Sequence, residues 1–104
     1  MWKFEDDLKL TNKSGLWIST HSWDIADGII KNLTSGTFLL PSNNATKPGT
    51  EVIEEPNHQV EQKWIPRYEN KEDYFILMDS NSQLYLTATS KDGLILEQSN
   101  LMYL

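Results

Sequence analysis

Short apolar or alternating runs, separated by turn-forming residues, follow one another along the whole chain. No stretch of about a dozen residues keeps apolar positions at the i, i+3, i+4, i+7 spacing of an amphipathic helix. The runs are short and end at Gly, Pro, Asn, Asp or Ser, as β-strands do. The predicted strands are 8–11, 16–20, 29–33, 37–40, 50–54, 62–65, 74–78, 83–87, 94–97 and 100–104. Many short strands with frequent turns predict an all-β barrel or sandwich.

The chain also contains an internal repeat. Trp2 and Trp23 lie 21 residues apart (23 − 2 = 21), and other residues match at the same offset. The matched pairs are Phe4 with Ile25, Asp6 with Asp27, Leu8 with Ile29, Ser14-Gly15 with Ser35-Gly36, Trp17 with Phe38 and Ile18 with Leu39. A looser third copy begins at Trp64 and has Asp79 where the second copy has Asn32.

Each copy predicts a Trp-headed strand, a β-hairpin, and an aromatic-aliphatic pair that points into a shared core. Three copies predict one β-trefoil-like domain over residues 1–104, a barrel with pseudo-threefold symmetry. The repeats are expected near 2–22, 23–63 and 64–104. Closing such a barrel removes the exposed strand edges that promote aggregation.

The middle of the chain carries the most specific motifs. They are Asp27-Gly28-Ile29-Ile30-Lys31-Asn32, Ser35-Gly36 with Leu39, Gly49-Thr50-Glu51-Val52-Ile53, and Gln62-Lys63-Trp64. Together they resemble one full repeat of a ricin B-type β-trefoil lectin, whose hallmark is Gln-x-Trp. The resemblance extends over residues 74–98 and is weaker at the N-terminus, where Trp2 and Trp23 lack the glutamine.

Three features depart from the family pattern. The first repeat has no strand between Thr20 and Trp23, and no further Gln-x-Trp follows Gln98. The family's sugar-binding aspartate would stand at Ser19, Leu40 or Thr87, and none of these is acidic. A carboxylate that accepts sugar hydroxyls makes a strong charge-assisted contact. Its loss puts the family's usual galactose specificity in question.

The resemblance implies a carbohydrate site on the loop 54–59 and on Gln62. Sugar recognition needs convergent hydrogen-bonding groups, and amides both donate and accept. The expected carbohydrate-binding residues are Asn57, His58, Gln62 and Asn44, and a weaker second site is expected at Thr87, Glu97 and Asn100. For Gln62 an alternative stays open, in which it braces the hairpin of its own repeat by bonding the backbone.

Composition limits the classes of partner that we expect the chain to bind. The net charge of −6 repels phosphate backbones and disfavours nucleic acid. No apolar run approaches the ~18 residues that would span a membrane. The N-terminal residues lack the apolar core of a signal peptide, so we expect secretion or cell-surface display only if the chain belongs to a larger toxin or lectin.

Catalysis is not expected. The sequence has no cysteine and two histidines, His21 and His58, without metal-ligand spacing, so we expect neither a metal nor a cofactor. Adjacent acidic pairs such as Glu54-Glu55 point apart along a strand rather than converge.

The sequence therefore predicts a non-enzymatic carbohydrate-binding module whose partner is a glycan or glycoprotein. A degenerate β-trefoil that acts as a protein-protein interaction or inhibitor module is the alternative, and a different small β-barrel is a third. The missing strands favour a homo-oligomer or a place in a larger multidomain protein, because open edges seek partners.

Overall fold

A computed structural model describes residues 2–4, 9–12, 18–58, 60–68, 75–89 and 93–98. These residues form ten strands and one 3₁₀ turn, η1 (Ser42–Asn44), and no α-helix. The strands are β1 (Trp2–Phe4), β2 (Lys9–Asn12), β3 (Ile18–Ala26), β4 (Ile29–Asn32), β5 (Phe38–Pro41), β6 (Val52–Glu55), β7 (Trp64–Tyr68), β8 (Phe75–Asp79), β9 (Tyr85–Ala88) and β10 (Leu94–Glu97). The all-β prediction is confirmed. The predicted strand 100–104 lies outside the described residues.

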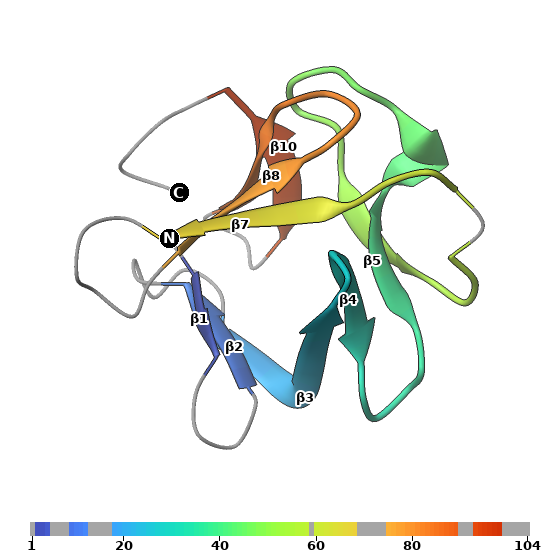
Figure 1. The fold of residues 1–104 in the computed structure, drawn as a ribbon, viewed down its shortest axis with the longest axis vertical. Helices are drawn as coiled ribbons and strands as arrows, with labels where there is room; N and C mark the ends of the chain where they lie inside the picture. Colours follow the sequence, from blue (N-terminus) through green and yellow to red (C-terminus); the bar gives the residue numbers. More distant parts are fainter. Residues whose placement is uncertain are drawn as a thin grey trace.

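All strand pairs are antiparallel, and the strands lie around a common interior (Figure 1). They run in the order β10-β9-β8-β1-β2-β3-β4-β5-β6, and β7 pairs with β8. The nine-residue β3 is shared by two sheets, since its first part pairs with β2 and its second part with β4. One uninterrupted strand therefore leads from the first repeat into the second.

The two ends of this strand order meet at a narrow seam. Glu51, just before β6, forms an isolated antiparallel bridge with Ile95 of β10. The Gly49 N–H donates to the Leu96 carbonyl (2.6 Å), and the Leu96 N–H donates to the Thr50 carbonyl (2.8 Å). The ladder is therefore not a closed barrel, although its end strands touch.

A two-residue turn joins β3 to β4. Asp27 (φ 53°) and Gly28 (φ 79°) both adopt left-handed backbone angles, as a type I′ hairpin requires. A Cβ at Gly28 would lie 3.0 Å from Lys63 Cβ and 3.1 Å from the Trp64 carbonyl oxygen. The Trp64 N–H donates to the Gly28 carbonyl at 2.7 Å. Glycine here lets the start of β7 pack against the turn.

Three tryptophans anchor the core. Trp2, Trp23 and Trp64 are buried together with aliphatic residues from strands and loops around the molecule. The Trp2 indole N–H donates to the Leu86 carbonyl (3.0 Å), and that of Trp64 donates to the Leu39 carbonyl (2.9 Å). Each of these indoles therefore fills the core and also ties its strand to a distant hairpin, where its N–H finds the partner that burial demands.

The predicted aromatic-aliphatic core pair is wrong at Phe38. Leu39 belongs to the core, whereas Phe38 is only half-buried. Neighbouring residues of a strand point to opposite faces, so the two cannot enter the same core. The matching residue Trp17 lies outside the described residues.

Strand register makes three residue pairs equivalent. Trp2 lies opposite Asn12, Trp23 opposite Asn32, and Trp64 opposite Asp79. Asn12 and Asn32 are 20 residues apart (32 − 12 = 20), so the predicted offset of 21 does not hold beyond the first strand. The stretch from Trp2 to its partner Asn12 (12 − 2 = 10) is one residue longer than the stretch from Trp23 to its partner Asn32 (32 − 23 = 9). The predicted matches at Asp6, Leu8, Ser14 and Gly15 lie outside the described residues.

The hairpins of the second and third repeats share one turn geometry. The Gly36 N–H donates to the Asn32 carbonyl, and the Gln83 N–H donates to the Asp79 carbonyl, both at 2.8 Å. The N–H groups of Asn32 and Asp79 donate to the carbonyls of Thr37 and Leu84, again at 2.8 Å. In both turns a side-chain oxygen accepts from the amide two residues later, at 2.9 Å for Asn32 and 3.4 Å for Asp79. These hairpins are the best-matched parts of the repeat.

Candidate functional site

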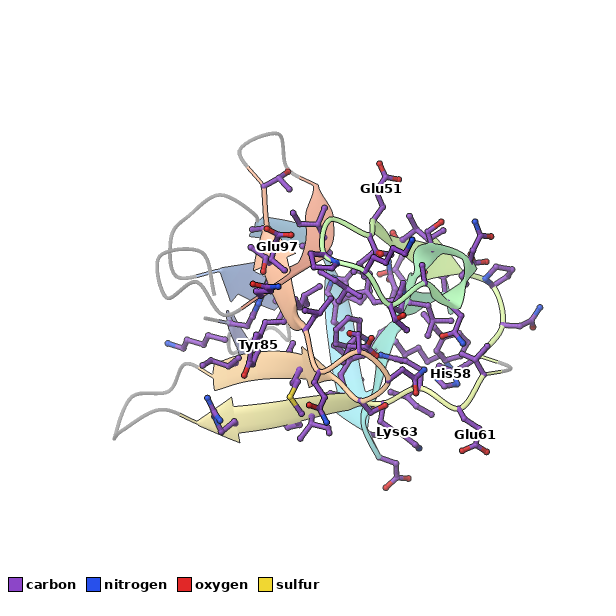
Figure 2. All side chains as sticks on the ribbon, turned by 90° about the horizontal axis from the view of Figure 1, so that it is seen from above. Glu51, His58, Glu61, Lys63, Tyr85 and Glu97 are labelled. Atoms are coloured by element: carbon purple, nitrogen blue, oxygen red, sulfur yellow. The ribbon has the colours of Figure 1, made fainter. Side chains whose placement is uncertain are left out.

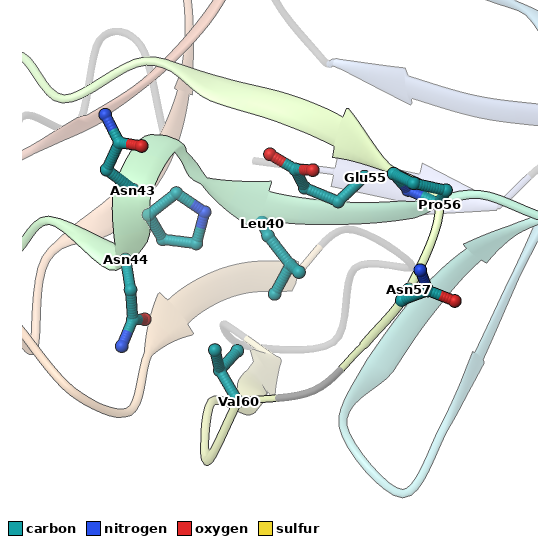
Figure 3. A pocket seen from close by; sticks show the side chains of 8 residues that line it. Leu40, Asn43, Asn44, Glu55, Pro56, Asn57 and Val60 are labelled. Atoms are coloured by element: carbon teal, nitrogen blue, oxygen red, sulfur yellow. The ribbon is translucent and has the colours of Figure 1, made fainter.

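A hollow of about 440 Å³ opens beside β5, η1 and β6 (Figure 3). Its size is within the range of small-molecule sites, roughly 300–1,000 Å³. The residues that line it are Leu40, Pro41, Asn43, Asn44, Glu55, Pro56, Asn57 and Val60. Leu40 and Val60 lie in its middle, Glu55 above them, and the asparagines at its two ends (Figure 3).

The 3₁₀ turn η1 presents two asparagines at one end. Asn43 (φ 55°) and Asn44 (φ 53°) both adopt left-handed angles, which asparagine tolerates better than most residues. The turn is held at its start by the Ser42 N–H, which donates to the Glu51 carbonyl at 2.8 Å. The Asn44 Oδ1 accepts from Asn81 Nδ2 of the third-repeat hairpin at 3.4 Å. Both asparagines are exposed, so their amides face solvent.

The register of β5 and β6 places the hollow's carboxylate. Phe38 lies opposite Glu55, and Leu40 lies opposite Ile53. Opposite residues of an antiparallel pair share a face, as do residues two apart in one strand. Glu55 and Leu40 are therefore on the same face of the sheet, with Phe38 between Glu55 and Lys31 of β4.

The lining combines polar groups with an apolar floor. The asparagine amides donate and accept hydrogen bonds, whereas the Glu55 carboxylate only accepts. Leu40, Val60 and two prolines supply aliphatic surface. None of the described residues that line the hollow is cationic or aromatic. The arrangement fits a small hydroxyl-bearing ligand with one apolar face.

Two of the predicted carbohydrate residues lie at this hollow, namely Asn44 and Asn57. His58 does not line it, and its ring meets the Phe38 ring edge-on with centroids 5.9 Å apart and planes at 72°. The His58 Nε2 is buried and has no hydrogen-bond partner among the described residues. His58 thus adjoins the hollow without facing it.

The prediction for Gln62 needs correction. Its side chain is fully buried, and its Nε2 donates to Asp79 Oδ1 at 3.0 Å. A side chain with no exposed surface cannot contact a glycan in this conformation. Gln62 instead braces the hairpin of the third repeat through the Asp79 side chain, whereas the alternative interpretation expected a backbone bond within its own repeat, 23–63.

The structure describes two of the three residues of the weaker predicted site, Thr87 and Glu97. Thr87 is only 4% exposed, and its hydroxyl donates to the Tyr85 carbonyl at 3.0 Å. Glu97 is half-buried on β10, opposite Tyr85. Asn100 lies outside the described residues. Burial therefore leaves Thr87 almost no surface for contact with a ligand.

Sequence reasoning included Glu55 in the loop 54–59 that it expected to carry the site, but it did not single out Leu40 or Val60 as lining residues. Leu40 was considered only as the position of a missing aspartate. The signal that identifies Glu55 is the pairing of Phe38 with Glu55, a register that the sequence alone does not reveal.

The described part of the chain contains no group of three or more His, Cys, Asp or Glu side chains placed to hold a metal ion. Within the same residues, no helix has the length and hydropathy needed to cross a membrane.

Fold and hollow together define the class, an antiparallel all-β protein with a polar surface site. Comparison of the chain with protein-family models, curated proteins and solved structures gave no match. The site's chemistry therefore has to be argued from its own residues.

Proposed function

We propose that the chain is a β-trefoil carbohydrate-binding module of the ricin B type. The three equivalent strand pairs headed by Trp2, Trp23 and Trp64 support the trefoil arrangement. The two indole-to-carbonyl bonds support it further, because each joins the first strand of one repeat to the second hairpin strand of another. The Glu51–Ile95 bridge is the contact through which the barrel would close.

The hollow of the second repeat is the observation on which the binding function rests. It brings Asn44 and Asn57 together with a carboxylate and an aliphatic floor, and these are the groups that recognise a sugar ring. It also lies on the loop where the resemblance to the ricin B-type family implies a site.

Amide-resolved NMR of the chain with a mixed pool of neutral oligosaccharides tests this function. We expect the amide signals of Asn43, Asn44, Glu55 and Asn57 to shift, and those of β10 to stay. Asn57→Ala should weaken binding, because it removes a donor and an acceptor from the hollow. Gln98→Ala is the matched control, since it truncates an exposed amide outside the hollow. A folded sample whose spectrum ignores every glycan would refute the proposal.

A second function is favoured by a specific observation, the absence of aromatic rings among the described residues that line the hollow. Sugar sites commonly stack a ring on an aromatic face, so a degenerate module that binds protein is the competing proposal. The exposed side chains of Leu33 (46%) and Ile65 (43%) would then contribute to a partner surface. This function would be supported if the wild-type chain bound no glycan but captured a protein partner, and if Ile65→Ser abolished that capture.

A further inference from the structure

Glu55 is the single ionisable side chain among the described residues that line the hollow. It stands at the end of β6, on the face of the sheet that also carries Leu40. The resemblance to the ricin B-type family expects an aspartate at the position of Leu40, but that residue is apolar and only 5% exposed. The hollow therefore contains a carboxylate that comes from a different strand.

We propose that Glu55 is the hydroxyl-accepting group of this site, and that it restricts the ligand to neutral, hydroxyl-bearing glycans. This inference rests on the proposed carbohydrate-binding function. A carboxylate can accept two neighbouring hydroxyls, a strong charge-assisted arrangement. The asparagines at the two ends complete the hydrogen bonding, and the half-buried Val60 contacts the C–H face of the ring.

The charge around the hollow excludes anionic sugars. A sialylated or sulfated glycan would bring a second negative charge beside Glu55, with no cation among the described lining residues to neutralise it. Lys31 belongs to β4, and its Nζ lies 5.9 Å from the centroid of the Phe38 ring of β5. Lys31 does not line the hollow, so it is not placed to neutralise a charge on the ligand.

A glycan panel measured on the wild-type chain and on Glu55→Gln tests the inference. The panel contains neutral, sialylated, sulfated and free-amine oligosaccharides of matched length. The wild type should bind neutral members and reject the anionic ones, and Glu55→Gln should lose roughly tenfold or more in affinity for the neutral ones. Glu61→Gln makes the same change of charge at an exposed residue that points away from the body of the molecule (Figure 2) and should bind like the wild type.

The outcomes separate this inference from the function on which it rests. Equal binding of anionic and neutral glycans by the wild type would overturn the inference and leave the carbohydrate function standing. Stronger binding of free-amine sugars would overturn the neutral ligand class in the same way. Unchanged affinity in Glu55→Gln would remove Glu55 from the contact, whereas failure of the whole panel would refute the function itself. The preference of the wild-type chain for neutral over anionic glycans is measured without any variant. This part of the test therefore stands even if Glu55→Gln folds poorly.

Discussion

The hairpins of the second and third repeats have the same backbone turn, but the buried side chain at its start donates a hydrogen bond in the second repeat and accepts one in the third. The second turn is built on the amide Asn32 and the third on the carboxylate Asp79, each 1% exposed. Asn32 donates from Nδ2 to Glu54 Oε1 at 3.0 Å, whereas Asp79 accepts from Gln62 Nε2 at 3.0 Å. A buried polar residue is tolerated in either form, provided that its partner offers the complementary group.

The partners also differ in where they lie. Glu54 is exposed on β6, next to the hollow's Glu55, and it also accepts from the Thr37 hydroxyl at 2.5 Å. Gln62 is fully buried, so the third hairpin is fastened to the core. The second hairpin is therefore linked to an exposed side chain of β6, and the third is linked both to the buried Gln62 and, through Asn81, to Asn44 at the hollow.

The largest expected effect comes from removing the buried carboxylate. Asp79→Leu leaves the Gln62 Nε2, the Asn81 N–H and the Ser82 hydroxyl without their acceptor. Of these donors the Gln62 amide is fully buried, and an orphaned buried donor costs about 1–3 kcal/mol, so we expect a loss of about 2–3 kcal/mol in the free energy of unfolding. Asn32→Leu should cost less, since the partners Thr34, Ser35 and Glu54 are exposed and can turn to water. Urea denaturation of both variants measures the difference, and equal losses would break the comparison.

A conservative swap sharpens the same point. In Asp79→Asn the Gln62 amide can turn over, so that its Oε1, which has no partner among the described residues, accepts from the new amide. We expect a cost of about 1 kcal/mol or less, well below that of Asp79→Leu. The same urea titration reads it, and a cost as large as that of Asp79→Leu would show that the charge itself is required.

The next effect concerns the two indoles that tie the hairpins. Trp64→Phe removes the bond to Leu39, and Trp2→Phe removes the bond to Leu86, with a similar loss of volume. Each variant should lose about 1–3 kcal/mol in the free energy of unfolding. Equivalent repeats predict losses that agree to within about 0.5 kcal/mol by denaturant titration. A gap of more than about 1 kcal/mol would argue against equivalence.

The smallest effect lies at the fifth residue of each turn. Gly36 (φ 76°) and Gln83 (φ 60°) both adopt left-handed angles, and glycine carries no Cβ penalty there. Gln83→Gly should stabilise the protein by about 0.5–1 kcal/mol, and Gly36→Gln should destabilise it by a similar amount. Thermal unfolding of the two variants should therefore shift in opposite directions. Shifts of the same sign would mean that the turns are not equivalent.

The sequence predicts the strands and the anchors better than it predicts the site. The short apolar runs 37–40 and 94–97 fall close to β5 and β10, because turn-forming residues bound each run on the sequence. The Trp-headed repeat identified Trp2, Trp23 and Trp64, all of which are buried. Local pattern is sufficient for these features.

The inward direction of Gln62 depends on Asp79, 17 residues further along the chain. The position of Glu55 beside the hollow depends on the register between β5 and β6. Neither is a property of a local run of residues, and a register shift of one residue would turn Glu55 to the opposite face. The predicted residues that lie at the hollow, Asn44 and Asn57, are exposed, whereas the sequence could not place lining residues whose positions depend on strand pairing.

The seam at Glu51 and Ile95 has a kinetic consequence. Its two backbone bonds join segments more than forty residues apart in the chain, and closing so large a loop costs entropy before any contact compensates for it. Neighbouring hairpins such as β8–β9 close first because their loops are short. Substitutions at the seam should therefore leave the folding rate nearly unchanged and accelerate unfolding, so that this narrow contact contributes to how long the folded molecule persists.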